Sequence, residues 1–309
     1  MTPVHTPSPL TAAICTFNRA KRLEAAILSL REQTLDLELG PDLEPALPIL
    51  VIDNGSTDET PRLVRELAQS MPQLRYILER EPGLSRARNR ALVECKTEII
   101  AYLDDDAIAD ANWAGAIVAC FRELSPHVAA VGGRIKPLWE VPKPDWLDHA
   151  LEGYFSALDL GSGSMVLREP CIFGANMAFK VAEVAAAGGF PNRLGRNGQS
   201  LLSNEELAVC FALRQRGLAL AYCGGAIVEH FVPKERLSEQ WLVSRVYSQG
   251  VSDAVLYTRV LPSMKAAVRV FIDALTGLAV EAAGEALPIG GRLKRAYVRG
   301  LLRGGLFGT

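Results

Sequence analysis

Three consecutive aspartates at positions 104–106 directly follow the apolar run Ile99–Leu103. Such a run is typical of a buried strand in a parallel sheet, and open α/β sheets bind ligands beyond the carboxyl ends of their strands. Adjacent carboxylates raise each other's cost of ionisation, so three together pack poorly unless they face a crevice. Carboxylate oxygens in a crevice can hold a divalent cation, which in turn holds a phosphate. A solvated turn with a helix cap is the alternative, but a cap accounts for Asp110 or Asn112 better than for three aspartates.

Three further apolar runs, at 10–15, 49–53 and 74–78, precede the run that leads into the aspartates. Segments with apolar residues at helical spacing separate these runs. This alternation predicts a doubly wound, mostly parallel sheet. Thr16 and Asp53 then lie at strand carboxyl ends, as the aspartates do, so one crevice can collect them. Polar groups there could bind the base and ribose of a nucleotide while the metal binds its diphosphate. Between the second and third runs we expect a helix that begins at Pro61 and is capped by Thr60.

The second half of the chain is less regular. We expect a helix capped by Asn204, and strands at 128–135, 172–179, 218–223 and 227–229. Glu205 and Glu206 fall in the first turn of this helix, where the helix dipole favours acids. The segment 136–170 is irregular and rich in aromatic residues, so it either shapes a substrate site or packs against the sheet. His230 follows the last strand and either completes the metal site, since imidazole tolerates Mn²⁺, or has a structural role.

From residue 233 onward, the spacing of apolar residues indicates helices. The segment 260–283 is rich in Ala, Val and Leu, but no uninterrupted apolar run reaches the length of a membrane span. Basic and apolar residues alternate at 292–303, a composition typical of an interfacial helix on an anionic membrane. A helix packed on the rest of the chain, with a solvated basic face, is the other possibility.

The composition argues against several classes of protein. Of the 309 residues, 49% are hydrophobic, so a large core is available and global disorder is excluded. The net charge of −2 argues against binding to nucleic acid, which would favour a basic protein. The six cysteines show no Cys-x-x-Cys spacing and the N-terminus lacks a secretory pattern, so we expect a reduced, cytoplasmic protein.

Five short motifs occur in a fixed order along the chain: Thr16-Phe17-Asn18-Arg19, Asp53-Asn54-Gly55-Ser56, Gly83-Leu84-Ser85-Arg86-Ala87-Arg88-Asn89, Leu103-Asp104-Asp105-Asp106 and Asn204-Glu205-Glu206-Leu207. This ordered set resembles the family-2 glycosyltransferases with a GT-A fold, and within them the bacterial enzymes of surface or exopolysaccharide assembly. The resemblance extends from about residue 8 to about residue 235. It implies a Rossmann-like nucleotide-binding half and a C-terminal helical extension. We accordingly divide the chain into a flexible tail (1–9), a GT-A domain (10–232) and a C-terminal helical region (233–309).

The resemblance implies an inverting transfer of a sugar from a nucleoside diphosphate donor, with UDP-sugars favoured. The acceptor would be a hydroxyl of a saccharide or of a lipid-linked substrate in polysaccharide biosynthesis. Membrane contact at the inner face of the plasma membrane would suit a lipid-linked acceptor. A sugar hydroxyl is a weak nucleophile, so such an enzyme needs a positioned carboxylate to take its proton.

The resemblance also implies roles for particular residues. Asp106 would bind Mn²⁺ or Mg²⁺, Asp104 would lie by the ribose and the metal, and His230 is the further candidate ligand described above. The donor would be bound by Thr16, Phe17, Asn18, Asp53, Arg86, Arg88, Asp104 and Asp105, with Asp53 accepting from a ring N–H of the base. The family places its catalytic base in a Glu-Asp motif, which reads Glu205-Glu206 here. The base is therefore Glu206 or Glu205.

Two other functions compete with this interpretation. A non-catalytic protein of the same fold could bind a nucleotide sugar or act as a scaffold, although it would not need a general base. A nucleotidyltransferase also places acids on a nucleotide-binding sheet. That class normally has a Gly-rich basic loop after the first strand, and the segment 16–19 is not such a loop.

Overall fold

The computed structural model describes residues 8–33, 46–198, 200–260 and 289–306. The first part of the chain alternates strands and helices as expected, namely β1 (Leu10–Thr16), α1 (Ala20–Arg31), β2 (Ile49–Asp53), α2 (Thr60–Ser70), β3 (Leu74–Leu78), α3 (Leu84–Glu94) and β4 (Ile99–Leu103). These four strands are parallel in the order β3-β2-β1-β4, with Thr16 opposite Asp53 at the carboxyl end.

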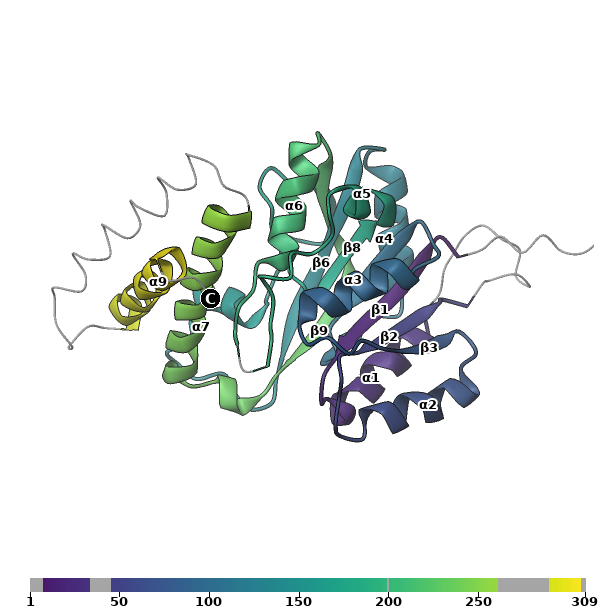
Figure 1. Ribbon diagram of the computed structural model, residues 1–309, viewed down its shortest axis with the longest axis horizontal. Helices are drawn as coiled ribbons and strands as arrows, with labels where there is room; N and C mark the ends of the chain where they lie inside the picture. Colours follow the sequence, from purple (N-terminus) through teal and green to yellow (C-terminus); the bar gives the residue numbers. More distant parts are fainter. Residues whose placement is uncertain (1–7, 34–45, 199, 261–288, 307–309) are drawn as a thin grey trace, which may run out of the picture.

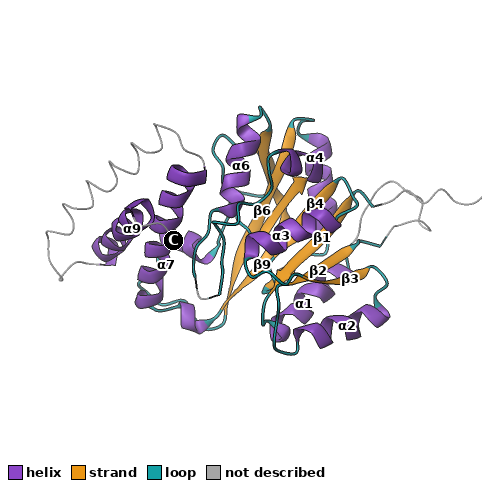
Figure 2. Cartoon of the chain, viewed as in Figure 1, coloured by secondary structure: helices purple, strands orange, loops and turns teal. Residues whose placement is uncertain are grey.

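The remaining elements extend this sheet and then leave it. They are β5 (Ala107–Ala109), α4 (Trp113–Glu123), β6 (Val128–Trp139), η1 (His149–Phe155), β7 (Ser164–Val166), β8 (Asn176–Lys180), α5 (Val181–Ala186), α6 (Glu205–Gln215), β9 (Ala219–Val232), η2 (Lys234–Arg236), α7 (Glu239–Val255), the π-helical turn η3 (Leu256–Val260) and α9 (Ile289–Leu306). The sheet is mixed and has nine strands in the order β3-β2-β1-β4-β8-β6-β9-β5, with β7 paired to β9. Figure 2 shows it as one twisted sheet between helices.

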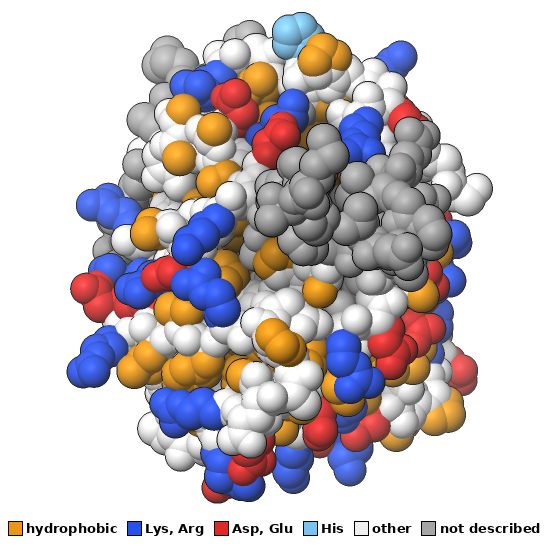
Figure 3. All heavy atoms as spheres, turned by 90° about the vertical axis from the view of Figure 1, so that its right-hand side faces the viewer, with side chains coloured by type: hydrophobic (Ala, Val, Ile, Leu, Met, Phe, Trp, Pro, Cys, Tyr) orange, Lys and Arg blue, Asp and Glu red, His pale blue; other side chains and the backbone are white. Residues whose placement is uncertain are grey.

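Helices cover both faces of the sheet, because strand residues alternate between two hydrophobic clusters. Ile14 of β1 packs in the cluster that includes α1, α2 and α4, whereas its neighbour Ala13 packs in the cluster that includes α3, α5 and α6. The fold is therefore α/β with three layers. Basic and acidic side chains are interspersed on the described part of the face in Figure 3, in keeping with the nearly balanced composition.

Several expectations for single elements were wrong. The segments 218–223 and 227–229 form one strand, β9, because residues 224–226 bulge out of the ladder with β6 and pairing resumes at Ile227. A turn closed by the N–H of Asn176 and the carbonyl of Phe173 delays β8 to Asn176. Thr60 is the first residue of α2 and not its cap, since its N–H donates to the carboxylate of Asp58. The short strands β5 and β7 carry too few residues to give a pattern, and they were missed.

The C-terminal helices α7 and α9 lie side by side next to the sheet (Figure 1). Glycine permits their close approach, because a Cβ at Gly250 would lie 2.1 Å from the carbonyl oxygen of Tyr297. Leu293 and Leu301 of α9 are buried, so this helix adopts the packed arrangement. None of the helices in the described ranges is both long and apolar enough to span a membrane. The expected tail at 1–9 and the segment 260–283 lie largely outside the described residues, and contact with a membrane remains a prediction.

Candidate active site

The turn after β4 brings two of the aspartates next to His230. Strand β5 pairs with β9 so that Ala107 lies opposite His230, which places the imidazole beside the acidic turn. The Nε2 atom of His230 lies 3.1 Å from Asp106 and 3.9 Å from Asp104. One potential ligand atom from each of the three residues falls within 4.8 Å of the others. Two carboxylates and one imidazole suit Mn²⁺ or Mg²⁺, with Mn²⁺ the better match for the imidazole.

Protonation links the two buried members of this group. Burial opposes ionisation of Asp106, but the hydrogen bond and charge of His230 hold the pKa of Asp106 well below its usual range. Burial likewise disfavours the imidazolium, yet the bond to Asp106 raises the pKa of His230. The Nδ1 atom of His230 is buried and has no hydrogen-bond partner. The contact with Asp106 therefore favours a proton on His230, and a bound divalent cation would supply positive charge in the same place.

Two arginines that the sequence analysis did not assign to the site stand close to Asp106. Their guanidinium nitrogens lie 3.7 Å (Arg19) and 3.9 Å (Arg236) from its second oxygen. Arg19 belongs to the first motif, and its position directly after a strand-end Thr-Phe-Asn could have indicated this. Arg236 is the last residue of η2 and carries no such local signal.

Asp105 faces away from the potential metal group. Its carboxylate accepts a hydrogen bond of 2.7 Å from the hydroxyl of Thr16, at the end of the neighbouring strand β1. Burial, together with the charge of Asp106, raises the pKa of Asp105 to about 7. Asp105 thus links β4 to β1 and fixes the turn that presents the other two aspartates.

A cavity of about 300 Å³ opens on this group and contains half of the expected donor-binding residues. Thr16, Phe17 and the three aspartates line it together with His230. Phe17 is 49% exposed, so its ring is free to contact a ligand. The side chain of Asp53 does not line this cavity, and its oxygens accept hydrogen bonds from the N–H of Ser56 and the hydroxyl of Tyr76.

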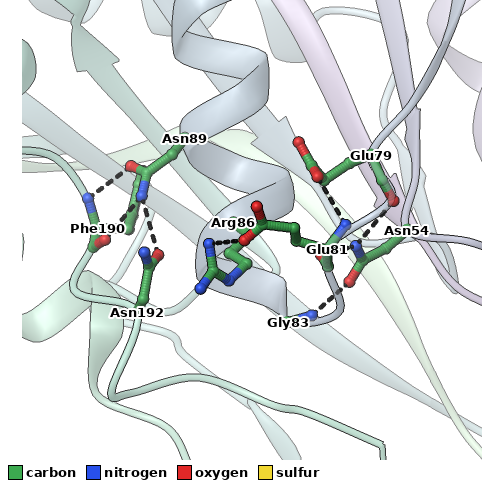
Figure 4. A network of polar contacts seen from close by, with 8 residues as sticks. All are labelled: Asn54, Glu79, Glu81, Gly83, Arg86, Asn89, Phe190 and Asn192. Carbon is green, nitrogen blue, oxygen red and sulfur yellow. Dashed lines mark hydrogen bonds and ion pairs between the residues drawn. The ribbon is translucent and has the colours of Figure 1, made fainter.

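Asn18 and Arg86 also lie outside the cavity lining, and both make contacts within loops. Asn18 accepts a hydrogen bond of 2.8 Å from the N–H of Thr57, and so ties the loop after β1 to the loop after β2. Arg86 points to Glu81 and forms an ion pair with it (Figure 4). In the same view, Asn54 accepts from the N–H of Gly83 at 2.7 Å, which holds the start of α3 in place.

A second cavity, of about 470 Å³, lies against the first turn of α6 and contains Arg88, Glu205 and Glu206. Arg88 forms a buried ion pair with Glu205 and lies 3.9 Å from Asp104. Gly174 makes room for this arginine, since a Cβ there would lie 2.4 Å from its Nη2 atom. Arg88 therefore connects the acidic turn with the first turn of α6.

The two glutamates of the second cavity have different surroundings. Glu205 is neutralised by Arg88, whereas Glu206 has no arginine at ion-pairing distance among the described residues. Burial and the neighbouring charge of Glu205 raise the pKa of Glu206 to about 8, and its Oε2 atom is buried without a hydrogen-bond partner. The Oε2 atom of Glu205 also lacks a described partner, so the two glutamates differ in the ion pair with Arg88, which only Glu205 forms among the described residues.

The start of α6 is attached to the C-terminal helices. Asn204 occupies the N-cap position with a left-handed φ of 76°, but its side chain makes no capping bond. Its amide instead donates to Asp253 at 2.6 Å and accepts from Gln249 at 2.9 Å, both on α7. The hydroxyl of Tyr297 on α9 donates to the other oxygen of Asp253 at 2.6 Å. The expected cap position of Asn204 is confirmed, but its side chain bonds across to α7 and not to the N–H groups of α6.

The two cavities meet at Asp104, and Arg196 and Arg236 also line both. Residues 11–179, more than half of the chain, match the sequence model of glycosyl transferase family 2. The chain belongs to this family. It is a glycosyltransferase with a GT-A fold, and the nucleotide-sugar class of donor follows from that membership.

Relatives of this glycosyltransferase include a glucosyl-dolichyl phosphate glucuronosyltransferase of Haloferax volcanii, 25% identical over 80% of this chain and 77% of the relative. Another is the succinoglycan biosynthesis protein ExoM of Rhizobium meliloti, 23% identical over 84% of this chain and 81% of the relative. Among solved structures, a mannosyltransferase of Pyrobaculum calidifontis in complex with GDP-Man and Mn²⁺ is similar with a TM-score of 0.59 and 21% identity, covering 96% of this chain and 87% of that one.

Proposed function

We propose that this glycosyltransferase requires a divalent cation and inverts the configuration of the sugar that it transfers. The donor would be a nucleoside diphosphate sugar, with UDP-sugars favoured, and the acceptor a hydroxyl of a saccharide or lipid-linked substrate in polysaccharide biosynthesis. One observation carries the proposal: Asp104 lines both cavities, one containing the potential metal ligands Asp106 and His230 and the other containing the unpaired carboxylate Glu206.

The donor half would lie in the smaller cavity. Asp104, Asp106 and His230 would hold Mn²⁺ or Mg²⁺, which supplies positive charge for the leaving diphosphate. Arg19 and Arg236 lie within 4 Å of Asp106 and would add positive charge on the same side. Thr16 and Phe17 line the part of the cavity where a nucleoside would lie. Asp53 would hold the neighbouring loop in place through its hydrogen bonds to Ser56 and Tyr76. It would contact the nucleobase of the donor directly only if the nucleobase replaced one of these bonds.

The acceptor half would lie in the larger cavity. Glu206 would take the proton of the attacking hydroxyl through its unpartnered oxygen, and a raised pKa makes a carboxylate a stronger base. Glu205 would remain ionised beside Arg88 and position the loop. One base on the acceptor side and a leaving group on the opposite side fit a single displacement, which inverts the anomeric carbon.

A screen of nucleotide sugars tests the proposal. The purified chain is incubated with UDP- and GDP-sugars in Mn²⁺, Mg²⁺ or EDTA, and release of the nucleotide is followed. We expect release with one class of donor, its loss in EDTA, and an inverted anomeric proton coupling in the product by NMR. Equal release in EDTA would refute the metal requirement, and a retained configuration would refute the single displacement. Binding of a donor without any turnover would favour the scaffold function.

We also propose a cytoplasmic location at the inner face of the plasma membrane. Two relatives carry dolichyl phosphate and PP-undecaprenol in their names, and both of these are lipid-linked groups. The basic residues of α9 would then contact anionic headgroups, while its apolar face stays packed on α7. Sedimentation with vesicles of anionic and of neutral lipid tests this, since only the anionic vesicles should retain the protein.

A further inference from the structure

Three arginines from separate parts of the chain converge on the larger cavity. Arg196 comes from the loop before α6, Arg236 from η2 and Arg245 from α7. Burial lowers the pKa values of Arg236 and Arg245, and the positive charge of Arg196 lowers both further. Arg196 is therefore close enough to both Arg236 and Arg245 to repel them.

The described ion-pair and hydrogen-bond partners of these arginines do not fully offset the repulsion. Arg236 is 12% exposed, and its ion-pair partner among the described residues, Asp106, lies 3.9 Å away. No described carboxylate lies within ion-pairing distance of Arg196 or Arg245. Among the described residues, Arg245 donates only a long bond of 3.4 Å to Ser203, and its buried Nη1 atom has no hydrogen-bond partner there. Burying a guanidinium in this state costs stability, because its lost hydration is not replaced.

Arg88 in the same cavity shows the contrast. It is 3% exposed and forms an ion pair with Glu205, so its burial is balanced within the chain. Arg245 is also buried, but it has no described carboxylate at ion-pairing distance, and the more distant charges of Glu206 and Glu205 do not outweigh the effect of burial. Since a second charge of opposite sign would remove the cost, the arrangement is that of a binding site for an anion. Guanidiniums that approach from several elements match the several oxygens of a phosphate.

The loop that carries Arg196 is held firmly on α3. The carbonyl of Arg196 accepts a hydrogen bond of 2.9 Å from the N–H of Leu84, and the hydroxyl of Ser85 donates to the carbonyl of Leu194 at 2.7 Å. Its position over the cavity is therefore set before any ligand binds, and a ligand gains from this pre-organisation.

We propose that Arg245, with Arg196, binds a phosphate group of the acceptor close to the hydroxyl that Glu206 deprotonates. This inference rests on the proposed function for the identity of the acceptor. The donor also carries phosphates, but Arg245 lines only the larger cavity, whereas Arg196 and Arg236 line both. The cavity of about 470 Å³ has the size of a small-molecule site. The phosphate and the attacked hydroxyl therefore belong to the same sugar or to adjacent ones.

Binding of inorganic phosphate tests the site without turnover. Calorimetry is performed on the full chain with Mn²⁺ and saturating nucleoside diphosphate, so that the donor's own phosphate positions are filled. We expect Arg245→Gln to weaken phosphate binding by roughly tenfold or more, as for loss of a charge-assisted hydrogen bond. The affinity for the nucleoside diphosphate should not change. Arg216→Gln, at an exposed arginine paired with Glu183, is the matched control and should change neither affinity.

Arg196→Gln is the second variant. It replaces the guanidinium at an exposed position, so the substitution should not disturb the packing of the core. It should weaken both phosphate and nucleoside diphosphate, since Arg196 lines both cavities. Equal phosphate affinity in Arg245→Gln and the unmodified chain would overturn the proposal. A parallel loss of nucleoside diphosphate binding in Arg245→Gln would also overturn it, by assigning the arginine to the donor.

Competition by glucose 1-phosphate and by glucose separates this inference from the proposed function. The unmodified chain should bind the phosphorylated sugar at least about tenfold more tightly, and Arg245→Gln should lose that preference. Equal binding of the two sugars would overturn the inference even if sugar transfer is observed. Preferential binding without any transfer from nucleotide sugars would instead uphold the anion site and refute the function.

Discussion

The guanidinium of Arg88 is ion-paired with the carboxylate of Glu205, and the two side chains are 3% and 5% exposed. The partners are 117 residues apart in the chain. Glu205 is held in this pair, whereas the adjacent Glu206 has no described arginine at ion-pairing distance. In the proposed mechanism, Glu205 maintains the site and Glu206 acts as the base.

Replacing Glu206 by Gln should abolish most of the transfer activity. Glu206→Gln keeps the size and polarity of the side chain but removes the proton acceptor, so transfer should fall by roughly 100- to 10,000-fold. The affinity for donor and metal should stay within a factor of about two, because Glu206 lines only the larger cavity. Steady-state transfer and calorimetry measure the two effects. Glu235→Gln, at an exposed glutamate, is the control, and a near-normal rate in Glu206→Gln would reassign the base.

Replacing Glu205 should instead destabilise the fold. Glu205→Gln leaves Arg88 buried without its partner, and breaking a buried pair typically costs about 3–5 kcal/mol. Urea unfolding of the variant, compared with Glu66→Gln in an exposed pair, measures this difference. A free energy of unfolding equal to that of the unmodified chain would contradict the assignment of Glu205 as a positioning residue.

The pKa of Glu206 predicts a pH dependence of stability. Burial raises this pKa from 4.5 to about 8, so the folded chain retains a proton that the unfolded chain loses. The stability contributed by Glu206 is therefore complete below about pH 4.5 and declines as the pH rises to about 8. Glu206→Gln has no such decline, so its melting temperature should exceed that of the unmodified chain increasingly from about pH 5 to pH 8. Melting curves without divalent cations measure this, and a pH-independent difference would contradict it.

Activity should follow the same ionisation in the opposite direction. Because the base must be deprotonated, transfer at saturating substrate should rise with pH up to about 8. Positive charge from a bound cation near Asp104 favours the carboxylate, so the midpoint should lie lower at saturating Mn²⁺ than at limiting Mn²⁺. Rate profiles at the two concentrations test the shift. A midpoint that moves upward with Mn²⁺ would show that the cation acts elsewhere.

Replacing Asp106 should remove metal-dependent binding of the donor. Asp106→Asn retains the shape of the side chain and removes a ligand charge, and the loss should exceed the roughly 10- to 100-fold typical of an outer-shell partner. Asp105→Asn is a close control, because Asp105 bonds to Thr16 and not to the metal group. Calorimetry of a nucleoside diphosphate with and without Mn²⁺ tests both. Equal losses in the two variants would contradict the assignment of ligands.

Replacing Tyr297 should slow sugar transfer, although Tyr297 lines neither of the two cavities of the site. Tyr297→Phe removes the hydrogen bond to Asp253, which holds Asn204 directly before the two glutamates. A loss of one such bond corresponds to roughly a 2- to 10-fold fall in kcat, with the KM for the donor unchanged. Tyr247→Phe, at an exposed tyrosine on α7, is the matched control. A rise in donor KM without a change in kcat would refute a role of α9 in positioning the base.

Local sequence patterns predicted the nucleotide-binding half of the fold well. The strands β2, β3 and β4 begin and end at the expected residues, because each is a short apolar run bounded by turn or helix signals. The grouping of Thr16 with the aspartates followed from the parallel order of the strands. The position of Asp53 at the same edge was correct, but its hydrogen bond to Tyr76 depends on the neighbouring strand and has no local signal.

The features of the site that the sequence did not predict depend on contacts between residues far apart in the chain. The pairing of Arg88 with Glu205, the attachment of Asn204 to α7 and the convergence of three arginines join segments that share no pattern. The helix dipole was an adequate reason for two acids at the start of α6, so the sequence could not distinguish Glu205 from Glu206. Only their surroundings in the folded chain do so.

The bulge at residues 224–226 restricts changes in chain length within β9. The amide of Asn176 donates to the carbonyl of Ala226 at 2.8 Å and to that of Arg134 at 3.0 Å, which holds both strands where the ladder resumes. Because side chains alternate along a strand, deleting one residue here without a compensating bulge would turn His230 to the opposite side of the sheet. Phe231 would then take the place of His230 facing the aspartates. Three residues with no partner in β6 thereby determine which side chain completes the proposed cation site.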